Sequence, residues 1–207
     1  NKTLITDQLN SLGFSKIGFT TPILPDQSRT ALDHWISQNF QGSMQWMERG
    51  QEKRNDLNLV LPGVKSVICT ATNYYTPSNS GEVMPAGRVS RYAWGDDYHK
   101  VIEKRQKQFV AWFKTAFPDH EIKAYVDTGP IPEKALAQQA GLGWQGKHSN
   151  LITRDYGSWV FLAEFLTTLE LEVNEPGTDL CGTCTARIDA CPTQAIVEPY
   201  VVDARRC

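Results

Sequence analysis

Apolar runs of strand length alternate with amphipathic stretches of helix length from residue 2 to residue 170. Such alternation is typical of an α/β fold. The pattern predicts helices over residues 2–12, 29–40, 97–117 and 131–140, with short helical turns up to residue 63. It predicts strands over residues 16–19, 64–74 and 122–126, and a β-hairpin made of residues 149–153 and 158–168.

The helix expected over residues 97–117 has the clearest periodicity. Apolar side chains recur at spacings that place them on one face, at Tyr98, Ile102, Phe109, Phe113 and Phe117. The polar side carries four basic residues, Lys100, Lys104, Arg105 and Lys107. A charge run on a helix is usually a solvated face, and we interpret this one in that way rather than as a surface for nucleic acid.

The composition is that of an ordinary folded chain. Of the 207 residues, 41% are hydrophobic and 21% are charged, and the formal net charge is -2. No apolar run approaches the roughly 18 to 20 residues of a membrane span, and the first residues lack the apolar stretch of a signal peptide. We therefore expect a cytoplasmic monomer without a membrane contact. The net charge provides no overall attraction for nucleic acid, so any RNA contact must be local.

Asp127 stands where ligand chemistry is expected in an α/β fold. It follows the strand over residues 122–126 and precedes Pro130, which suits the first turn of the next helix. Ligands collect outside the carboxyl ends of strands in open α/β sheets. The carboxylate could cap the helix by accepting backbone N–H bonds, which would keep it ionised. Under a bulky ligand it would instead hold a proton and donate it near neutral pH.

Two further stretches carry side chains suited to ligand binding. Residues 141–148 contain three glycines, together with Trp144 to offer a flat face and Lys147 to offer a charge. Their spacing matches neither a Walker A loop nor a dinucleotide fingerprint. Residues 91–99 form an aromatic and polar approach to the long helix. His99 is explained equally well there by an exposed position on the first turn and by a ligand contact.

Four of the five cysteines lie close to the end of the sequence. The fifth, Cys69, falls in an apolar strand, where free cysteine packs as a small core residue. Cys181, Cys184 and Cys191-Pro192 match the start and end of the bacterial ferredoxin run C-x2-C-x2-C-x3-C-P. Arg187 stands where the third cysteine of that run belongs. The alternative is a tetrahedral zinc site made of Cys181, Cys184, Cys191 and Cys207.

These motifs together resemble the epoxyqueuosine reductase family, which comprises cobalamin-dependent iron–sulfur enzymes of queuosine biosynthesis in tRNA. The matching segments are RYAWGDDYHK (residues 91–100), VDTGPIPEKALAQQAGLGWQGKHSNLI (126–152), YGSWVFLAE (156–164) and CGTCTARIDACPTQAI (181–196). Weaker agreement runs through SMQWM (43–47) and LPGVKSVI (61–68). Because the resemblance covers nearly the whole chain in order, it is more specific than any one motif.

The resemblance implies a fold and a reaction. Residues 1–171 would form a cobalamin-binding mixed-sheet α/β domain similar to that of reductive dehalogenases, and residues 172–207 would begin a ferredoxin-like 4Fe–4S domain. The chain would be an oxidoreductase that reduces epoxyqueuosine to queuosine at the tRNA wobble position. Electrons would pass from an external donor through two 4Fe–4S clusters to cobalamin. The implied partners are that donor and tRNA carrying epoxyqueuosine.

Carried over by position, the resemblance also assigns roles to residues. It makes Asp127 the catalytic proton donor beside cobalt. It places eight residues at the corrin: Tyr98, His99, Lys134, Gly143, Trp144, Gly146, Lys147 and Ser149. Lys134 stands where the family commonly has arginine, so the charge is kept while a bidentate contact is lost. Cys181 and Cys184 would bind one cluster, and Cys191 and Cys207 would bind the other.

Departures from the family pattern leave other interpretations open. With Arg187 in place of a cysteine and no second motif after Cys207, neither cluster can be completed by this chain. We therefore expect a short or altered member of the family. One alternative is a non-catalytic cobalamin-binding domain or carrier. Another is a small zinc or iron–sulfur redox module, in which the cysteines bind metal and the α/β body recognises a different partner.

Overall fold

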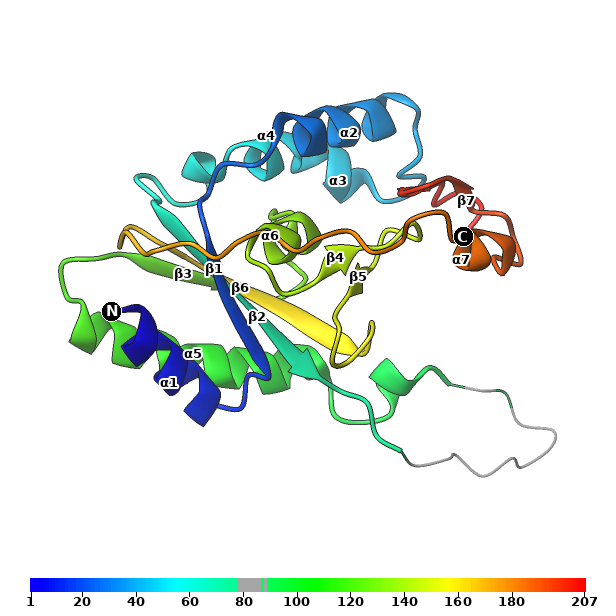
Figure 1. The fold of residues 1–207 in the computed structure, drawn as a ribbon. Coiled ribbons are helices and arrows are strands. Elements are labelled where there is room, and N and C mark those ends of the chain that lie inside the picture. Colours follow the sequence, from blue (N-terminus) through cyan, green and yellow to red (C-terminus); the bar gives the residue numbers. More distant parts are fainter. Residues whose placement is uncertain (78–86, 88) are drawn as a thin grey trace.

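A four-stranded antiparallel sheet forms the centre of the protein in the computed structural model, which describes residues 1–77, 87 and 89–207 (Figure 1). The strands lie in the order β1 (Lys16–Thr20), β2 (Ser66–Asn73), β6 (Val160–Thr167) and β3 (Ile122–Tyr125). The longest pairing, between β2 and β6, runs from Ser66 opposite Thr167 to Asn73 opposite Val160. This arrangement makes β6, the last of these strands in the sequence, a central strand.

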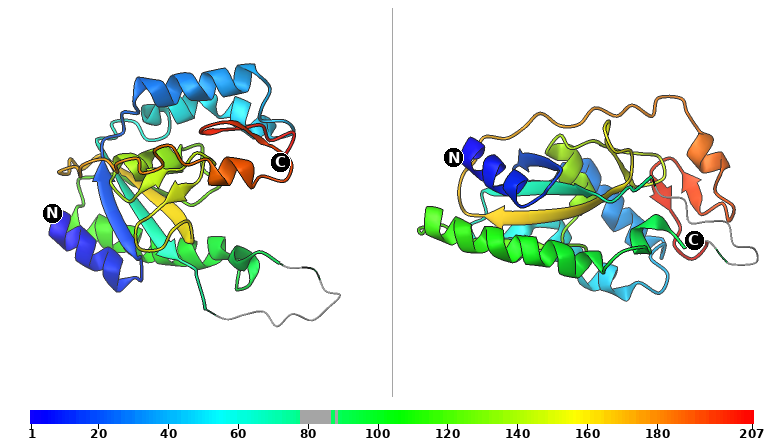
Figure 2. Two further views of the ribbon diagram at one scale, coloured as in Figure 1. Left: turned by 45° about the vertical axis from the view of Figure 1, so that its right-hand side comes forward. Right: turned by 90° about the horizontal axis from the view of Figure 1, so that it is seen from below.

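Helices cover both faces of this sheet. One face carries α1 (Lys2–Ser11) and α5 (Tyr98–Ala116), and the opposite face carries α6 (Glu133–Gln139) (Figure 1). Beyond α6 lie α2 (Asp26–Ser37), α3 (Gln45–Arg49), α4 (Gln51–Asn55) and the 3-10 turn η1 (Leu57–Leu59) (Figure 2). The remaining elements are η2 (Arg91–Ala93), β4 (Trp144–Gln145), β5 (Leu151–Ile152), α7 (Ala186–Asp189), β7 (Ile196–Glu198) and β8 (Val201–Val202).

The sheet separates two apolar cores. Successive residues of a strand point to opposite faces, so β6 contributes Phe165 to the core beneath α1 and α5 and Leu166 to the core beneath α6. Phe165 is fully buried and packs against Phe109 of α5 with ring centroids 4.6 Å apart. Cys69 is fully buried in the α6 core, which confirms its interpretation as a core residue. Glu164 of β6 is also fully buried, on the same face as Leu166.

The expected helices and strands are confirmed, with ends that shift by up to three residues. The hairpin expected from residues 149–153 and 158–168 is wrong. The first of its strands, β5, pairs with β4, and the second, β6, pairs with β2 and β3. A single bridge, Thr153 to Gly157, remains between the two segments. The reason is burial: β6 is apolar enough to sit between two strands, and the sequence pattern identifies a strand without identifying its partners.

The mixed sheet expected from the resemblance is also wrong for the described residues, because every pair in the central sheet is antiparallel. Strands β2 and β3, which α5 connects, do run in the same direction. They are not neighbours, however, because β6 lies between them in the opposite direction. An α/β fold is therefore confirmed, with antiparallel rather than mixed pairing.

Residues 172–207 pack against the body of the protein. The extended run after β6 exchanges hydrogen bonds with Phe19 through Asn174, whose N–H donates to the Phe19 carbonyl at 2.9 Å. Farther along, the small part with α7, β7 and β8 reaches α2, where the Trp35 indole N–H donates to the carbonyl of Val202 at 2.7 Å. The division into domains at residues 171 and 172 stays a prediction.

Among the described residues, no helix combines the length and the apolar character that crossing a membrane requires. The expected cytoplasmic location is not tested by this observation and stays a prediction.

We predict that Phe165→Ala lowers the free energy of unfolding by about 3–5 kcal/mol, because it leaves a cavity between β6 and α5. Chemical denaturation followed by circular dichroism measures this change. Leu4→Ala, on an exposed position of α1, is the matched control and should change the free energy by less than about 0.5 kcal/mol. Equal effects of the two substitutions would contradict the assignment of Phe165 to a tightly packed core.

Candidate functional site

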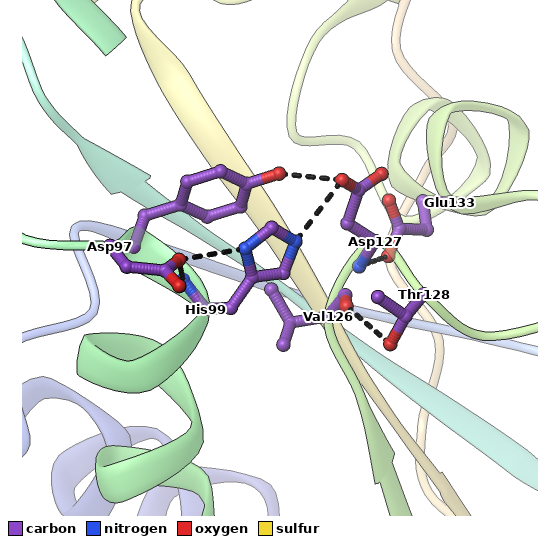
Figure 3. A network of polar contacts seen from close by, with 7 residues as sticks. Asp97, His99, Val126, Asp127, Thr128 and Glu133 are labelled. Carbon is purple, nitrogen blue, oxygen red and sulfur yellow. Dashed lines mark hydrogen bonds and ion pairs between the residues drawn. The ribbon is translucent and has the colours of Figure 1, made fainter. Parts of the chain in front are cut away.

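Asp127 lies two residues beyond the end of β3, beside the start of α5. Its oxygen Oδ2 accepts a hydrogen bond from the Tyr98 hydroxyl at 2.5 Å and lies 3.4 Å from Nε2 of His99. The Asp127 N–H group donates to Oε1 of Glu133 at 2.6 Å (Figure 3). The Asp127 side chain is 61% exposed. Three neighbours therefore hold this residue in place while its carboxylate stays accessible to a ligand.

His99 is held between two carboxylates (Figure 3). Oδ1 of Asp97 accepts the His99 backbone N–H at 3.0 Å, which caps α5, and lies 2.8 Å from Nδ1 of the ring. Burial alone would lower the pKa of His99, but its hydrogen bonds with Asp97 and Asp127 outweigh burial and raise that pKa. Burial and the hydrogen bond to Asp127 raise the pKa of Tyr98 as well, so its hydroxyl stays a donor. Both neighbours thus direct hydrogen-bond donors at Oδ2 of Asp127.

The helix-capping role considered for Asp127 is wrong. Helix α6 begins at Glu133 rather than at Ile131, and the residue before it, Pro132, provides no side-chain cap. The turn from β3 spans residues 126–132, here named the Asp127 loop, and no side chain in it caps the helix. Asp127 has a φ of 55°, a left-handed conformation that residues other than glycine rarely adopt.

Two more carboxyl groups lie behind Asp127, and sequence reasoning missed both. Glu133 begins α6, and Glu164 lies beneath it on the central strand β6, opposite Tyr125 of β3. Burial is the main cause that raises the pKa of Glu133 to about 7 and that raises the pKa of Glu164 well above its ordinary value. The available signal was Glu164 itself, a charged residue in the middle of an apolar strand. Sequence alone does not show that it meets Glu133.

Stacked rings support the site from the side of β2 and β6. Tyr98 lies between two rings, with its centroid 4.0 Å from that of His99 and 4.1 Å from that of Phe161. Phe161 stacks in turn on Tyr74 at 4.4 Å. Because Tyr98 is confined by both faces, its hydroxyl has a fixed direction toward Asp127.

The glycine-rich residues serve mainly internal packing. A Cβ atom on Gly143 would lie 2.1 Å from the carbonyl oxygen of Ile152, and one on Gly146 would lie 2.6 Å from the Ile152 side chain. Both glycines therefore let β4 and β5 approach each other. Trp144 remains half-buried, and its indole N–H group has no acceptor among the described residues.

Lys147 and Ser149 contact the cysteine-containing segment. The Lys147 ammonium group donates to the carbonyl oxygens of Gly182 at 2.7 Å and Cys184 at 2.9 Å. The Ser149 hydroxyl donates to the carbonyl of Tyr200 at 2.9 Å. These contacts fix the segment against the body of the protein. Lys134 has a different position: it is exposed beside Glu133, and its positive charge opposes the rise that burial causes in the pKa of Glu133.

The cysteine segment provides thiols without assembling a metal site. Cys181 and Cys184 lie in one turn, in which the Cys184 N–H donates to the Cys181 carbonyl at 3.0 Å. Sγ of Cys191 accepts the N–H of Ala195 at 3.3 Å. Hydrogen bonds from the backbone N–H groups of Ile196 and Ala195 lower the pKa of Cys191 to about 7. Within residues 1–77, 87 and 89–207, no three His, Cys, Asp or Glu side chains gather around one metal position. The zinc set that includes Cys207 is therefore not assembled.

The family model and two similar curated proteins carry the same family name. The family model described as "Epoxyqueuosine reductase QueG, DUF1730" matches residues 54–128. An epoxyqueuosine reductase of Gloeobacter violaceus is 49% identical over 205 residues, which are 98% of this chain and 63% of that protein. One from Atelocyanobacterium thalassa is 44% identical over 98% of this chain and 67% of its own length. The chain thus spans about two thirds of the length of these relatives.

Solved structures agree with the sequence relatives. An epoxyqueuosine reductase crystallised with an epoxyqueuosine-modified tRNA stem loop is 33% identical, with a TM-score of 0.85 over 100% of this chain and 55% of its own. A Bacillus subtilis epoxyqueuosine reductase, solved with its catalytic aspartate loop swung out of the active site, is 32% identical, with a TM-score of 0.86 over 100% of this chain and 55% of its own. The reductive dehalogenase NpRdhA shares the fold, with a TM-score of 0.53 over 98% of this chain and 23% of its own at 11% identity.

The resemblance of the motifs is therefore confirmed along almost the full length of the chain, both in sequence and in three dimensions. The α/β fold with its reductive-dehalogenase-like topology is confirmed at the level of the fold. The protein belongs to the epoxyqueuosine reductase family.

Proposed function

We propose that this chain is the cobalamin-binding part of an oxidoreductase that reduces epoxyqueuosine in tRNA to queuosine, with Asp127 as the proton donor. One observation carries the proposal: Tyr98 and His99 hold an accessible Asp127 carboxylate at the end of β3 in a member of the epoxyqueuosine reductase family. The part of the reaction assigned to this chain is the binding of cobalamin and the delivery of a proton.

The chemistry of the site fits cobalamin. A corrin carries amide side chains, which need donors and acceptors, and a flat ring, which needs an open surface. The Trp144 indole N–H group is buried without an acceptor among the described residues, and a propionamide oxygen would supply one. Asp127, Tyr98 and His99 form a polar, partly open surface after β3. We propose these residues and Lys134 as cobalamin contacts.

The other proposed contacts act less directly. Gly143 and Gly146 shape the β4–β5 pair that carries Trp144. The Lys147 ammonium group and the Ser149 hydroxyl are already engaged with backbone carbonyls of residues 182, 184 and 200. We therefore propose that these four residues define one wall of the cobalamin site through the backbone and that Lys147 connects this wall to the cysteine segment.

Cobalamin, when bound and reduced, supplies the electrons for removal of the epoxide oxygen. The departing oxygen gains negative charge and needs a proton. A ligand over the exposed Asp127 carboxylate removes water from it and favours its protonated form, because desolvation disfavours the anion. Tyr98 donates a hydrogen bond to Oδ2 and so directs the other oxygen, Oδ1, toward the substrate. His99, beside Oδ2, is positioned to return a proton to Asp127 after each turnover.

We propose that the cysteine segment belongs to the electron supply. Cys181 and Cys184 are assigned to one 4Fe–4S cluster, and Cys191 and Cys207 to a second. The N–H group that the Ala195 backbone directs at Sγ of Cys191 supports this role, because such hydrogen bonds stabilise thiolates that ligate iron. The contact between Lys147 and the Cys184 carbonyl connects this segment to the proposed cobalamin wall.

The partners follow from the same proposal. The tRNA stem loop in a relative's crystal structure supports tRNA carrying epoxyqueuosine as the substrate. We further propose an external electron donor, a cytoplasmic location and a monomeric state. A second function, a cobalamin-binding domain without turnover, is favoured by Arg187, which replaces a cluster ligand in the ferredoxin run.

We predict that the purified chain binds hydroxocobalamin in a 1:1 ratio and retains it through gel filtration. The visible spectrum of cobalamin follows the titration. Asp127→Asn should bind within about tenfold of the unmodified chain, because the amide keeps the shape of the carboxyl group and one hydrogen bond of about 0.5–1.5 kcal/mol is at stake. No retained cobalamin would reject both proposed functions.

We predict that the chain, loaded with cobalamin and supplied with titanium(III) citrate in place of the clusters, converts an epoxyqueuosine-modified tRNA stem loop to the queuosine form. Mass spectrometry of the RNA measures the product. Asp127→Asn should lower the rate about 10²- to 10⁴-fold, the range of general acid catalysis. Asp119→Asn, at an exposed carboxylate remote from the site, is the control. Full activity of Asp127→Asn would show that another group donates the proton.

We predict that Cys191 is the thiol most reactive toward iodoacetamide at neutral pH. Thiolate is the reactive form, so the alkylation rate should rise as the pH increases through about 7, the pKa of Cys191. Peptide mass spectrometry identifies the alkylated residue. The fast reaction should disappear in Cys191→Ser and persist in Cys207→Ser. Its persistence in Cys191→Ser would contradict the thiolate-stabilising role of the Ala195 and Ile196 N–H groups.

A further inference from the structure

Two carboxyl groups behind Asp127, those of Glu133 and the buried Glu164, have no role in the proposed proton delivery. Glu164 is fully buried, and neither of its oxygens meets an N–H or hydroxyl donor among the described residues. A buried polar group without a partner is costly, and a buried carboxylate anion is more so. The group within hydrogen-bond reach of Glu164 is the carboxyl of Glu133. Two carboxyl groups can form a hydrogen bond only if one of them holds a proton.

The surrounding charges favour one shared proton. The carboxylate of Asp127, in the Asp127 loop, acts on the pair with its negative charge. Cys69 of β2, which lies opposite Glu164, contributes a buried and neutral thiol. Positive charges come from Lys134 on α6 and from Arg54 on α4, which interacts electrostatically with Glu133. Tyr98 of α5 and Tyr125 of β3 add neutral phenols. Glu164 is the more deeply buried group of the pair, so it holds the proton and donates a hydrogen bond to ionised Glu133.

The ionised state of Glu133 strengthens its hydrogen bond with the backbone of Asp127. Oε1 of Glu133 accepts the backbone N–H of Asp127 at 2.6 Å (Figure 3). The contact holds the residue whose left-handed φ of 55° is sparsely populated outside glycine. Ionised Glu133 is a strong acceptor for this N–H group, because hydrogen bonds to charged groups are the stronger ones. When Glu133 takes up a second proton for the pair, it becomes neutral and accepts the Asp127 N–H group less strongly.

We propose that Glu133 and Glu164 are positioning residues that share one proton and thereby hold the Asp127 loop, residues 126–132, so that the Asp127 carboxylate stays beside Tyr98 and His99. The proposal rests on the proposed function in that Asp127 is the group that must be positioned. Glu164 acts through Glu133, and Glu133 acts through the Asp127 backbone. Neither carboxyl group donates a proton to the substrate.

The proposal predicts a pH dependence of one backbone hydrogen bond. As the pH falls through about 7, the pKa of Glu133, that residue takes up the second proton and its bond to the Asp127 N–H group weakens. We expect the protection of the Asp127 amide hydrogen against exchange to fall about threefold to tenfold, the factor for a loss of about 0.5–1.5 kcal/mol. NMR measures this exchange after correction for the intrinsic pH dependence.

Matched variants separate positioning from a structural role. Glu133→Gln keeps an oxygen to accept the Asp127 N–H group but does not titrate, so the pH dependence of protection should disappear. Glu164→Met removes the hydrogen-bond donor to ionised Glu133 and keeps a side chain of similar length, so the transition should move to higher pH. Both changes preserve side-chain size, and circular dichroism confirms that the variants fold. Glu170→Gln, at an exposed position just beyond β6, should behave like the unmodified chain.

The outcomes decide the proposal. A transition near neutral pH that is lost in Glu133→Gln and shifted upward in Glu164→Met supports it. Protection that does not vary with pH in the unmodified chain, or that varies equally in all three variants, overturns it. The measurement needs no cobalamin, reductant or RNA. Full activity of Asp127→Asn in the turnover assay would therefore reject the proposed role of Asp127. An unchanged exchange rate of the Asp127 amide across the pH range would reject the positioning role alone.

Discussion

The hydrogen bond from the Asp127 N–H group to Glu133 is the contact on which the geometry of the site depends. It ties the end of an edge strand, β3, to the start of α6. With the backbone fixed there, the Asp127 side chain meets Tyr98 and His99 at the start of α5. One short contact thus connects elements from both faces of the sheet, and the carboxylate lies where they meet.

The central position of β6 makes this contact possible. As the strand between β2 and β3, β6 brings Glu164 beneath α6 and Phe161 beneath Tyr98. The same strand therefore supports the site twice, with a carboxyl group on one face and an aromatic ring on the other. The burial of Glu164 is unfavourable for stability. Its retention in a tightly packed core is understandable if the carboxyl group contributes to the arrangement of Asp127, since functional sites commonly keep such costly groups.

Local patterns in the sequence were sufficient to predict the helices and strands and to select Asp127 as a candidate site residue. The spacing of Ile102, Phe109 and Phe113 identified α5, and the position of Asp127 after an apolar strand identified the candidate site. The pairing of Glu133 with Glu164 could not be predicted, because it depends on which strands flank β6 and on a register that places Glu164 opposite Tyr125. Such pairings join residues far apart in the sequence. For the same reason the hairpin was wrong and the contacts of Lys147 were unforeseen.

The central claim is that Asp127 lies beside the cobalt of a bound cobalamin. A crystal structure of the chain grown with cobalamin, with anomalous diffraction recorded at the cobalt absorption edge, tests this most directly. We expect a single cobalt position whose nearest carboxyl group is that of Asp127, with the Tyr98 hydroxyl still donating to Oδ2. A cobalt position beside the cysteine segment, or one with Asp127 turned away and another carboxyl group closer, would contradict the claim.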